Sequence, residues 1–505
     1  MATLMGEAQI FGEQFLLALQ PYQLLMSALG VTFGMIWGAL PALSSTMAMA
    51  LLIGFSASME LNDAILFLLG VYTGGVFGGS ISAIFINIPG TPAAICTALE
   101  GFPLARKGEG GHALGTAIVG SAIGNIAGIL SLILLIPVIL WLALKFGSWE
   151  IFLLGLWGVA ISGTLTSGEA PLKGWISGWV GLLISMVGLE NIKGYHRFTF
   201  DIPMLITGIS FVPILIGLFG MAEVLKVLPD PNPYALQAKV TRVIPSFSFI
   251  RKFFRCVFRS SVIGAFIGAL PAMGADIASF ASYAVAKRRA SPEEAKKYGK
   301  GSYEGILASE VANNASIGGS LLPMLTLGIP GSTVAAAFLG ALNLHNVVVG
   351  PMINFTYPGL LHFVFAALII ANFFMYGLAL LLARPTVKIL SLPRQVLMPV
   401  IVPICVMGAF ATNNVYFDVY VMLIFGSVGY FMAKSGFPPG PMVMGVILGP
   451  LVDLNLRRAM IIFSDASIWD VLSRPLGDLL ILLVLWTFYD GIFRRQSFAE
   501  EKGVP

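Results

Sequence analysis

The 505-residue chain is poor in the residues that build metal centres and disulfide frameworks. Its three cysteines, Cys96, Cys256 and Cys405, stand far apart without metal or redox spacing, so we expect them to be small buried apolar side chains. Its four histidines are scattered, and we expect interface or loop positions for them. Charged residues make up only 11% of the chain, and the net charge of +4 is too small to indicate a nucleic-acid partner.

Several catalytic and targeting motifs are also absent. The sequence has no phosphate-binding GxxxxGK loop, no HExxH zinc motif and no GxSxG nucleophile turn, so it offers no machinery for using ATP or for hydrolysis. The first residues include Glu7 and Glu13 but no lysine or arginine, so we expect no cleavable signal peptide. We therefore predict that the protein is not an enzyme and uses no cofactor.

Apolar residues, by contrast, are abundant. They make up 57% of the chain, and the mean hydropathy is +0.89, which excludes a soluble globular protein of ordinary composition. About 20 apolar residues cross about 30 Å of hydrocarbon, so the apolar runs leave room for roughly 10 to 14 membrane crossings or half-crossings. The composition predicts an all-α, polytopic membrane protein.

Two apolar runs are each interrupted by Pro-Gly. They are GGSISAIFINIPGTPAA at residues 78–94 and GGSLLPMLTLGIPGSTVAA at residues 318–336. Proline lacks the N–H that a helix needs, and glycine raises the cost of helical angles, so we expect a broken helix or re-entrant hairpin at each site. Within a membrane such breaks occur where the backbone lines a cavity or is buried in protein. The two breaks are therefore the first candidates for a binding site.

The two breaks belong to a longer duplication. Residues 34–43 resemble residues 264–273 at an offset of 230, and the Pro-Gly breaks match at an offset of 241. Two landmarks in the same order indicate duplicated halves. We predict a first transmembrane repeat at 1–227, a linker at 228–255, a second repeat at 256–493 and a cytoplasmic tail at 494–505.

Basic residues indicate how the two halves are oriented. Arg106 and Lys107 follow the first break, whereas the basic cluster at 287–300 precedes the second, and the loops at 55–63 and 343–358 have no lysine or arginine. Because cytoplasmic loops are enriched in lysine and arginine, equivalent loops are expected on opposite sides of the membrane. The pattern predicts two inverted-topology repeats.

Small polar residues surround both breaks. For any one of them, hydrogen bonding between helices is the commoner role. Taken together, helix N-termini beyond the breaks favour an anionic group such as a carboxylate, and free carbonyl groups on the other side can hold Na⁺. The candidate substrate-binding residues are Asn87, Pro89, Gly90, Thr91, Pro92, Asn314, Pro330, Gly331, Ser332 and Thr333.

Three acidic residues, Asp276, Glu304 and Glu310, lie near the second break. An acid in apolar surroundings is a functional candidate by default. Asn313 and Asn314 share a helix face with Glu310, because they follow it by three and four residues. The pattern leaves two roles open for Glu310, a proton or ion relay and a structural cap of this polar network. Glu304 follows a charged loop, which favours a position at the membrane interface.

The stretches described above resemble the TctA family, the large membrane subunit of bacterial tripartite tricarboxylate transporters. The resemblance is carried by GGSISAIFINIPGTPAA with EGFPLARKGEGGHALG, and by ALPAMGADIASFASYAVAKRR with KGSYEGILASEVANNASIGGSLLPMLTLGIPGS. It runs from about Gly30 to residue 480. The chain departs from the family at Leu40-Pro41-Ala42 and Leu270-Pro271-Ala272, where Leu-Pro-Gly is usual.

The resemblance implies a secondary carrier in the bacterial inner membrane. Such a carrier takes organic carboxylates from a TctC-like periplasmic binding protein, works with a small TctB-like membrane subunit and uses a cation gradient. We expect alternating access, in which an elevator-like movement carries the breaks, with Na⁺ or H⁺ as the coupling ion. The candidates for cation coupling are Pro41, Ser44, Pro271, Asp276, Glu310 and Asn313.

Three alternatives stay open at this point. An anion channel can share the repeat but needs a continuous polar path, and a single-component carboxylate carrier needs no binding protein. An intramembrane enzyme needs a paired nucleophile and base within the bilayer, and the sequence offers no convincing pair. The identity of the carboxylate and of the coupling ion cannot be derived from these residues.

Overall fold

The computed structural model describes residues 2–40, 43–166, 170–190, 192–227, 243, 247–389, 394–464 and 473–494. Nearly all of them are helical, and the strands within these ranges are one short antiparallel pair, β1 (Gly188–Leu189) and β2 (His196–Arg197). Eight of the described helices are long and apolar enough to cross a membrane, and three shorter apolar helices accompany them. The prediction of an all-α, multi-pass membrane protein is confirmed.

The helices follow one another closely along both predicted halves. The first half contains α1 (Ala2–Ala18), α2 (Pro21–Ala39), α3 (Ser45–Ser56), α4 (Leu61–Ile86), η1 (Pro92–Ala94), α5 (Ile95–Arg106), α6 (Gly110–Ala143), α7 (Ser148–Thr166), α8 (Pro171–Ser185), η2 (Pro203–Leu205), α9 (Phe211–Leu215), η3 (Ile216–Met221) and α10 (Ala222–Val227). The remainder contains α11 (Phe247–Lys252), α12 (Phe254–Gly268), α13 (Gly274–Arg289), α14 (Pro292–Ala295), α15 (Tyr303–Leu327), α16 (Thr333–Leu344), α17 (Ile353–Thr356), α18 (Leu360–Ile389), α19 (Arg394–Asn413), α20 (Tyr416–Lys434), α21 (Pro439–Ile462), α23 (Pro475–Tyr489) and η4 (Asp490–Arg494). Most of the predicted linker and the predicted tail beyond residue 494 lie outside the described residues, so the domain boundaries stay predictions.

The long buried helices α4 and α15 occupy equivalent places in the two halves. Helix α4 packs against α2 and α18, and α15 packs against α12 and α6. A Cβ atom at Gly38 of α2 would come within 2.1 Å of the Gly75 carbonyl oxygen, and one at Gly268 of α12 within 2.6 Å of the Ser316 carbonyl oxygen. Glycine at these places lets two helix backbones touch. Since the four positions are related by the offsets of 230 and 241, the same contact recurs in both halves.

Both predicted breaks are present and have the same hydrogen bonding. Asn87 is the C-cap of α4 and Gly328 is the C-cap of α15, and both residues adopt left-handed angles, with φ of 55° and 74°. Beyond the turn, the Gly90 N–H donates to the Gly79 carbonyl over 3.3 Å, and the Gly331 N–H donates to the Ser320 carbonyl over 3.2 Å. The chain then resumes as η1 and α5 in the first half and as α16 in the second.

The two basic loops of the sequence lie together. The Lys107 Nζ, at the end of α5, donates to the Lys300 carbonyl oxygen over 2.7 Å. Nearby, the Glu100 carboxylate accepts from the Gly299 and Ser302 N–H groups over 2.7 and 2.8 Å. An inverted arrangement requires these loops to share one side of the membrane, and the contact meets that requirement. The inversion of the repeats itself stays a prediction.

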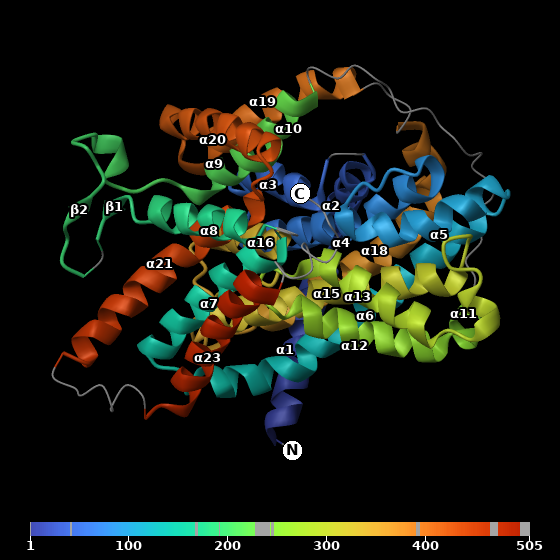
Figure 1. Ribbon diagram of the computed structural model, residues 1–505, viewed down its shortest axis with the longest axis horizontal. Helices are drawn as coiled ribbons and strands as arrows, with labels where there is room; N and C mark the ends of the chain where they lie inside the picture. The colour runs from blue at the N-terminus through green and yellow to red at the C-terminus, as the bar shows by residue number, and fades with distance from the viewer. Residues whose placement is uncertain are drawn as a thin grey trace.

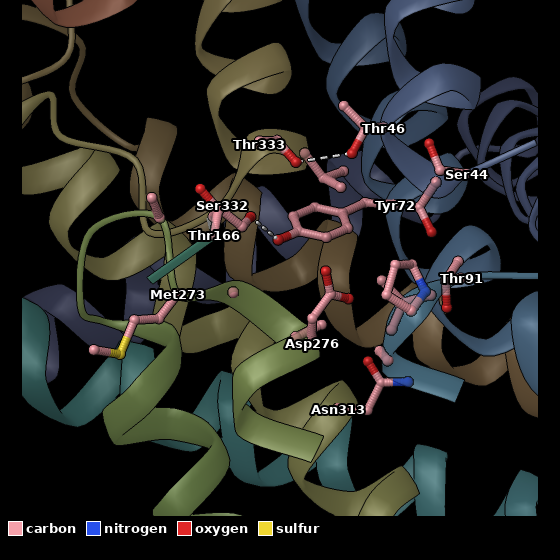
Figure 2. Close-up of a pocket in the computed structure, with 18 residues that line it drawn as sticks. Ser44, Thr46, Tyr72, Thr91, Thr166, Met273, Asp276, Asn313, Ser332 and Thr333 are labelled. Atoms are coloured by element: carbon pink, nitrogen blue, oxygen red, sulfur yellow. Dashed lines mark hydrogen bonds between the residues drawn. The ribbon is translucent and has the colours of Figure 1, made fainter. Parts of the chain in front are cut away.

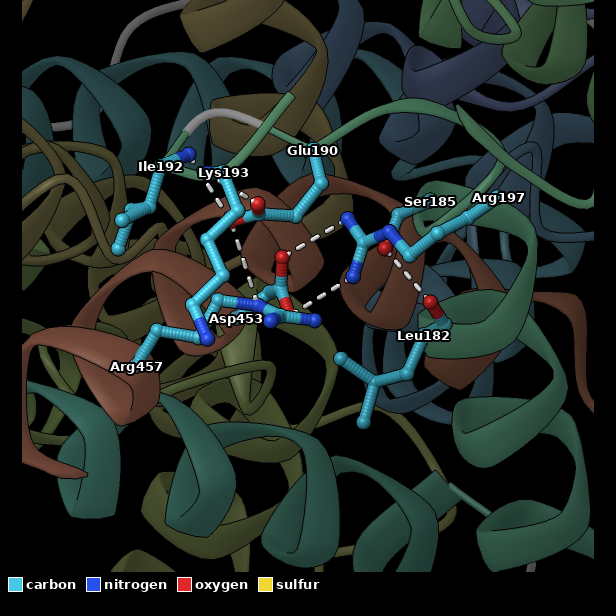
Figure 3. Close-up of polar contacts among 8 residues, drawn as sticks. All are labelled: Leu182, Ser185, Glu190, Ile192, Lys193, Arg197, Asp453 and Arg457. Atoms are coloured by element: carbon cyan, nitrogen blue, oxygen red, sulfur yellow. Dashed lines mark hydrogen bonds and ion pairs between the residues drawn. The ribbon is translucent and has the colours of Figure 1, made fainter. Parts of the chain in front are cut away.

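Two further groups of helices flank these elements (Figure 1). One group contains α7, α8, α21 and α23, and the other contains α9, α10, α19 and α20. The β1–β2 hairpin projects from the edge of the molecule. Figure 3 shows how it is held: the Arg197 guanidinium donates two hydrogen bonds to Asp453 of α21, over 3.0 and 2.9 Å, and Arg457 donates a third over 3.0 Å.

Candidate substrate cavity between the two helix breaks

A cavity of about 120 Å³ lies where the two broken segments meet (Figure 2). A volume of this size holds several water molecules or a small polar group. Its lining comes from both halves of the chain and is rich in hydroxyl and amide groups. The residues that line it are Ser44, Ser45, Thr46, Tyr72, Val76, Thr91, Pro92, Ala93, Thr166, Ala272, Met273, Gly274, Ala275, Asp276, Asn313, Ser332, Thr333 and Val334.

Most of the lining consists of equivalent positions from the two halves. Thr46 and Asp276 differ by the offset of 230, and Tyr72 and Asn313 differ by the offset of 241. The residues after the two Pro-Gly breaks pair in the same way, since residues 91–93 correspond to residues 332–334. The cavity is therefore built from the same places in two related folds, although the side chains at those places differ.

Two hydrogen bonds bridge the cavity between the halves. The Tyr72 hydroxyl lies 2.9 Å from the Ser332 hydroxyl, and the Thr46 hydroxyl lies 2.9 Å from the Thr333 hydroxyl. Figure 2 shows both bonds on the same side of the cavity, where α3 and α4 meet the start of α16. These contacts position the second break directly against helices of the first half.

The second break is capped by its own side chain. Ser332 is the N-cap of α16, and its Oγ accepts from the Ala335 N–H over 3.1 Å. An N-cap serine satisfies one of the N–H groups that have no partner within the helix. The hydroxyl thus contacts the helix N-terminus and the Tyr72 hydroxyl at once, at the wall of the cavity.

The first break has a different partner. Thr91 is the N-cap of η1, yet its side chain makes no capping bond, and its buried Oγ1 has no hydrogen-bond partner. The Ala93 backbone instead hydrogen-bonds the carboxyl group of Asp276, which is exposed to the cavity. A carboxylate of the chain itself therefore occupies the place where a helix N-terminus attracts an anion.

One further polar side chain at the cavity is unsatisfied. Asn313 has no exposed surface, and neither its Oδ1 nor its Nδ2 has a hydrogen-bond partner. Buried amide groups normally have hydrogen-bond partners, because a buried donor or acceptor without one costs about 1–3 kcal/mol. Figure 2 places Asn313 beside Asp276 at the cavity. Together with Thr91, these side chains offer unused donors and acceptors to a polar ligand.

The structure brings seven of the sequence-predicted residues together at this cavity. The lining includes Ser44, Thr91, Pro92, Asp276, Asn313, Ser332 and Thr333. Five others, which are turn residues at the breaks, do not line it: Asn87, Pro89, Gly90, Pro330 and Gly331. Pro271, Asn314 and Glu310 lie elsewhere, and Pro41 falls outside the described residues.

Sequence reasoning missed four polar lining residues. They are Ser45, Thr46, Tyr72 and Thr166, none of which lies next to a Pro-Gly break. A usable signal was present for two of them. Applying the offset of 230 to Asp276 leads to Thr46, and applying the offset of 241 to Asn313 leads to Tyr72.

Comparison with known proteins gives the chain a family context. Residues 24–444 match the model of the tripartite tricarboxylate transporter TctA family. An uncharacterized 52.8 kDa protein in the TAR-I ttuC' 3' region of Agrobacterium vitis is 37% identical over 471 residues, covering 93% of each chain. A second uncharacterized protein, in the TAR-II ttuC' 3' region of the same organism, is 38% identical over 224 residues, covering 44% of this chain and 90% of its own length. No solved structure matches the chain.

Proposed function

This chain belongs to the tripartite tricarboxylate transporter TctA family, and from that premise we propose that it is the large permease subunit of a binding-protein-dependent secondary carrier. It imports organic carboxylates of the tricarboxylate or dicarboxylate type by cation-coupled alternating access. The observation that carries this proposal is the cavity between the two breaks, lined by equivalent positions from both halves. A site at such a junction is the usual place for substrate in repeat-built transporters.

The charges at the cavity support coupling to a cation. Asp276 faces the cavity, and the described lining contains no lysine, arginine or histidine. A substrate carboxylate that enters this space comes close to the Asp276 carboxylate, and no basic side chain of the described lining offsets the repulsion between them. Two anionic groups in a site of low dielectric constant repel strongly. A bound cation, either H⁺ or Na⁺, relieves that repulsion and makes substrate binding depend on it.

The hydrogen bonds across the cavity favour a carrier over a channel. Tyr72 and Thr46 of the first half bond to Ser332 and Thr333 of the second. Such links join the two halves across the cavity, whereas an open pore needs a continuous polar path. We propose that the segments bearing the breaks move together against the surrounding helices, in an elevator-like manner.

The proposed partners follow from the family. The carrier works in the bacterial inner membrane with a small TctB-like membrane subunit and receives its substrate from a TctC-like periplasmic binding protein. A single-component carrier without a binding protein is the alternative within the same class.

The test is uptake of labelled carboxylates into proteoliposomes that hold the whole complex. Imposed Na⁺ and H⁺ gradients are compared, with and without the binding protein. We expect saturable uptake that requires the binding protein and one gradient. Flux that persists without the binding protein and without an ion gradient supports a channel. Saturable uptake without the binding protein supports the single-component carrier.

Two variants connect that uptake to the cavity. Thr91→Ala and Ser332→Ala each remove a hydroxyl at the cavity, and we expect each to lower uptake about fivefold, in line with the loss of one hydrogen bond of about 1 kcal/mol to the ligand or cap. Ser427→Ala is a matched control, because that exposed hydroxyl bonds only its own helix through the Leu423 carbonyl. Unchanged uptake in both cavity variants would exclude the site.

A further inference from the structure

A second polar site lies outside the cavity, around Glu310 in α15. Its carboxyl group has no exposed surface and is contacted by hydroxyl groups from three other helices. The Ser80 hydroxyl of α4 donates to Oε1 over 2.6 Å, and the Ser121 hydroxyl of α6 donates to Oε2 over 2.9 Å. The Thr97 hydroxyl of α5 also hydrogen-bonds Oε1. Within the described residues, no lysine, arginine or histidine forms an ion pair with Glu310.

The titratable groups on neighbouring helices do not supply a counter-charge either. Cys96 of α5 is the one whose side chain interacts electrostatically with Glu310. Four others on the packed helices engage different partners: Glu100 bonds the Gly299 and Ser302 N–H groups, Asp276 bonds the Ala93 backbone, Tyr72 bonds Ser332, and Arg259 faces Glu304. A buried carboxylate without a cation is costly in the membrane.

A chain of hydroxyl groups connects Glu310 to the first break. The Thr97 hydroxyl lies 3.1 Å from the Ser309 hydroxyl, which lies 2.7 Å from the Ser279 hydroxyl of α13. The Ser279 hydroxyl donates to the Ala93 carbonyl oxygen over 2.7 Å. Ala93 lines the cavity, and its backbone also bonds Asp276. The chain therefore has four links between the Glu310 carboxyl group and the edge of the candidate substrate site.

Counting hydrogen atoms shows what the chain requires. Each hydroxyl group supplies one proton to a hydrogen bond, and a carbonyl oxygen supplies none. If Glu310 is ionised, both ends of the chain are acceptors, and the hydroxyls of Thr97, Ser309 and Ser279 provide three protons for four links. If Glu310 carries a proton, all four links are satisfied, each donor pointing toward Ala93. Ser80 and Ser121 can donate to the carboxyl group in either state.

We propose that Glu310 binds a proton in this conformation and that this proton is coupled to transport in addition to the cation expected at Asp276, which makes the carrier proton-coupled. Loss of that proton leaves one link of the chain without a hydrogen atom, so the contact between α13, α15 and the first break loosens beside the cavity. Proton binding at Glu310 is thereby linked to the shape of the substrate site. The inference rests on the proposed transport function for its physiological meaning, but the proton itself is measurable without transport.

Infrared spectroscopy of the purified complex tests the proton directly. A protonated carboxyl group gives a C=O stretching band that a carboxylate lacks. We expect the wild-type protein to show such a band at neutral pH and Glu310→Gln to lose it, while the exposed control Glu60→Gln retains it. Asp276→Asn identifies any part of the band that belongs to the cavity. If Glu310→Gln leaves the band unchanged, the proposal is overturned.

Two serine variants separate the hydroxyl chain from the carboxyl group's other contacts. Ser279→Ala removes the links of Ser279 to Ala93 and to Ser309. The hydroxyl protons of Thr97 and Ser309 then suffice for the two links that remain, even when Glu310 is ionised. The band of the protonated carboxyl group should therefore disappear at a lower pH than in the wild type. Ser121→Ala removes a donor to Oε2 outside the chain, so it should move the loss of the band to higher pH. If the two variants shift the band in the same direction, or do not shift it, the proposed role of the hydroxyl chain is wrong.

Transport assays separate this inference from the proposed function. We expect an inward H⁺ gradient to drive uptake at least tenfold above the rate without a gradient. Glu310→Gln should lose this stimulation while still exchanging labelled for unlabelled carboxylate. Uptake driven by Na⁺ alone and indifferent to pH would overturn proton coupling and leave carboxylate transport intact. If no carboxylate is carried under any gradient, the proposed function fails, whatever the infrared result.

Discussion

The Tyr72 hydroxyl, in the middle of α4, lies 2.9 Å from the Ser332 hydroxyl that caps α16. The two residues are far apart in the sequence and belong to opposite halves of the chain. Their contact joins a helix that runs through to the first break with the helix that begins at the second. The hydrogen bond crosses the edge of the candidate cavity, so both its partners are positioned to sense a ligand there.

Replacing Tyr72 with phenylalanine should weaken substrate binding without unfolding the protein. The ring remains packed, and Ser332 keeps its bond to the Ala335 N–H, so only the link between halves is lost. One hydrogen bond contributes about 0.5–1.5 kcal/mol, which corresponds to a two- to tenfold rise in KM for uptake. Tyr420→Phe, at an exposed site on α20, is the control and should leave KM unchanged. An unaltered KM in both would show that the bond does not act on substrate.

Ser332→Ala should combine a loss of stability with a loss of uptake, and a second N-cap serine separates the two effects. Removing an N-cap serine costs about 1 kcal/mol of stability. Ser291 caps α14 by accepting from the Glu294 N–H over 3.3 Å, and it does not line the cavity. We expect both alanine variants to lower the thermal stability of the purified complex and only Ser332→Ala to lower uptake. Equal uptake by the two variants would indicate that Ser332 is only a cap.

Asp276→Asn should make substrate binding less dependent on the coupling cation. The change removes the negative charge that faces the cavity and keeps a side chain of similar size. Isothermal titration with a carboxylate, repeated over a series of pH values and Na⁺ concentrations, measures this dependence. We expect the wild-type affinity to rise at least fivefold with the coupling cation and the variant's affinity to rise by a smaller factor, because Glu310 still binds its proton. A variant with wild-type cation dependence would remove Asp276 from the coupling mechanism.

The hairpin contact predicts a change of local stability. Arg197 and Asp453 form a two-pronged, partly buried pair, with exposed side-chain fractions of 21% and 15%. Arg197→Ala leaves Asp453 with Arg457 alone, and we expect a loss of about 1–3 kcal/mol of local stability. Hydrogen exchange of amides in residues 188–197 measures the loss. Lys226→Ala, which breaks an exposed pair with Glu223, serves as the control and should cost much less. Equal protection of these amides from exchange in both variants would show that the Arg197–Asp453 pair does not stabilise the hairpin.

The same hairpin should loosen in acid because of Glu190. Burial by itself raises the pKa of this carboxyl group. Hydrogen bonds from the Lys193 and Ile192 N–H groups and the nearby Arg457 and Arg197 cations lower the pKa by more than burial raises it, so the pKa lies below its ordinary value. The folded hairpin therefore binds a proton less readily than the unfolded one. The stability that Glu190 contributes is complete above the pKa of the unfolded state and is lost as pH falls through the pKa of the folded state. Hydrogen exchange at decreasing pH should show this loss in the wild type and a smaller one in Glu190→Gln, where the Asp453 carboxylate still loses its charge, and with it the ion pair to Arg197, in acid.

Much of this protein was predictable from local sequence. The apolar composition required membrane helices, because apolar runs of this length have few other stable environments. The Pro-Gly pairs required interruptions, since neither residue continues a helix ladder. The repeated landmarks led to paired breaks, and the basic residues led to basic loops on one side of the membrane, with which the contact of Lys107 with Lys300 agrees. The spans and the breaks depend on residues close together in the chain, and the repeat and the sidedness of the loops follow from comparing segments of the sequence.

The roles of individual polar side chains depended on packing between distant segments. Asp276 and Glu310 are both acids near the second break, yet Asp276 faces the cavity and Glu310 is enclosed by hydroxyls of α4, α5 and α6. Tyr72 has no local signal of function, but the crossing of α4 and α16 brings it to Ser332. A helix places its side chains on every face, and the sequence alone does not say which face meets which neighbour. Only the tertiary structure decides that, because the contacts join residues separated by hundreds of positions.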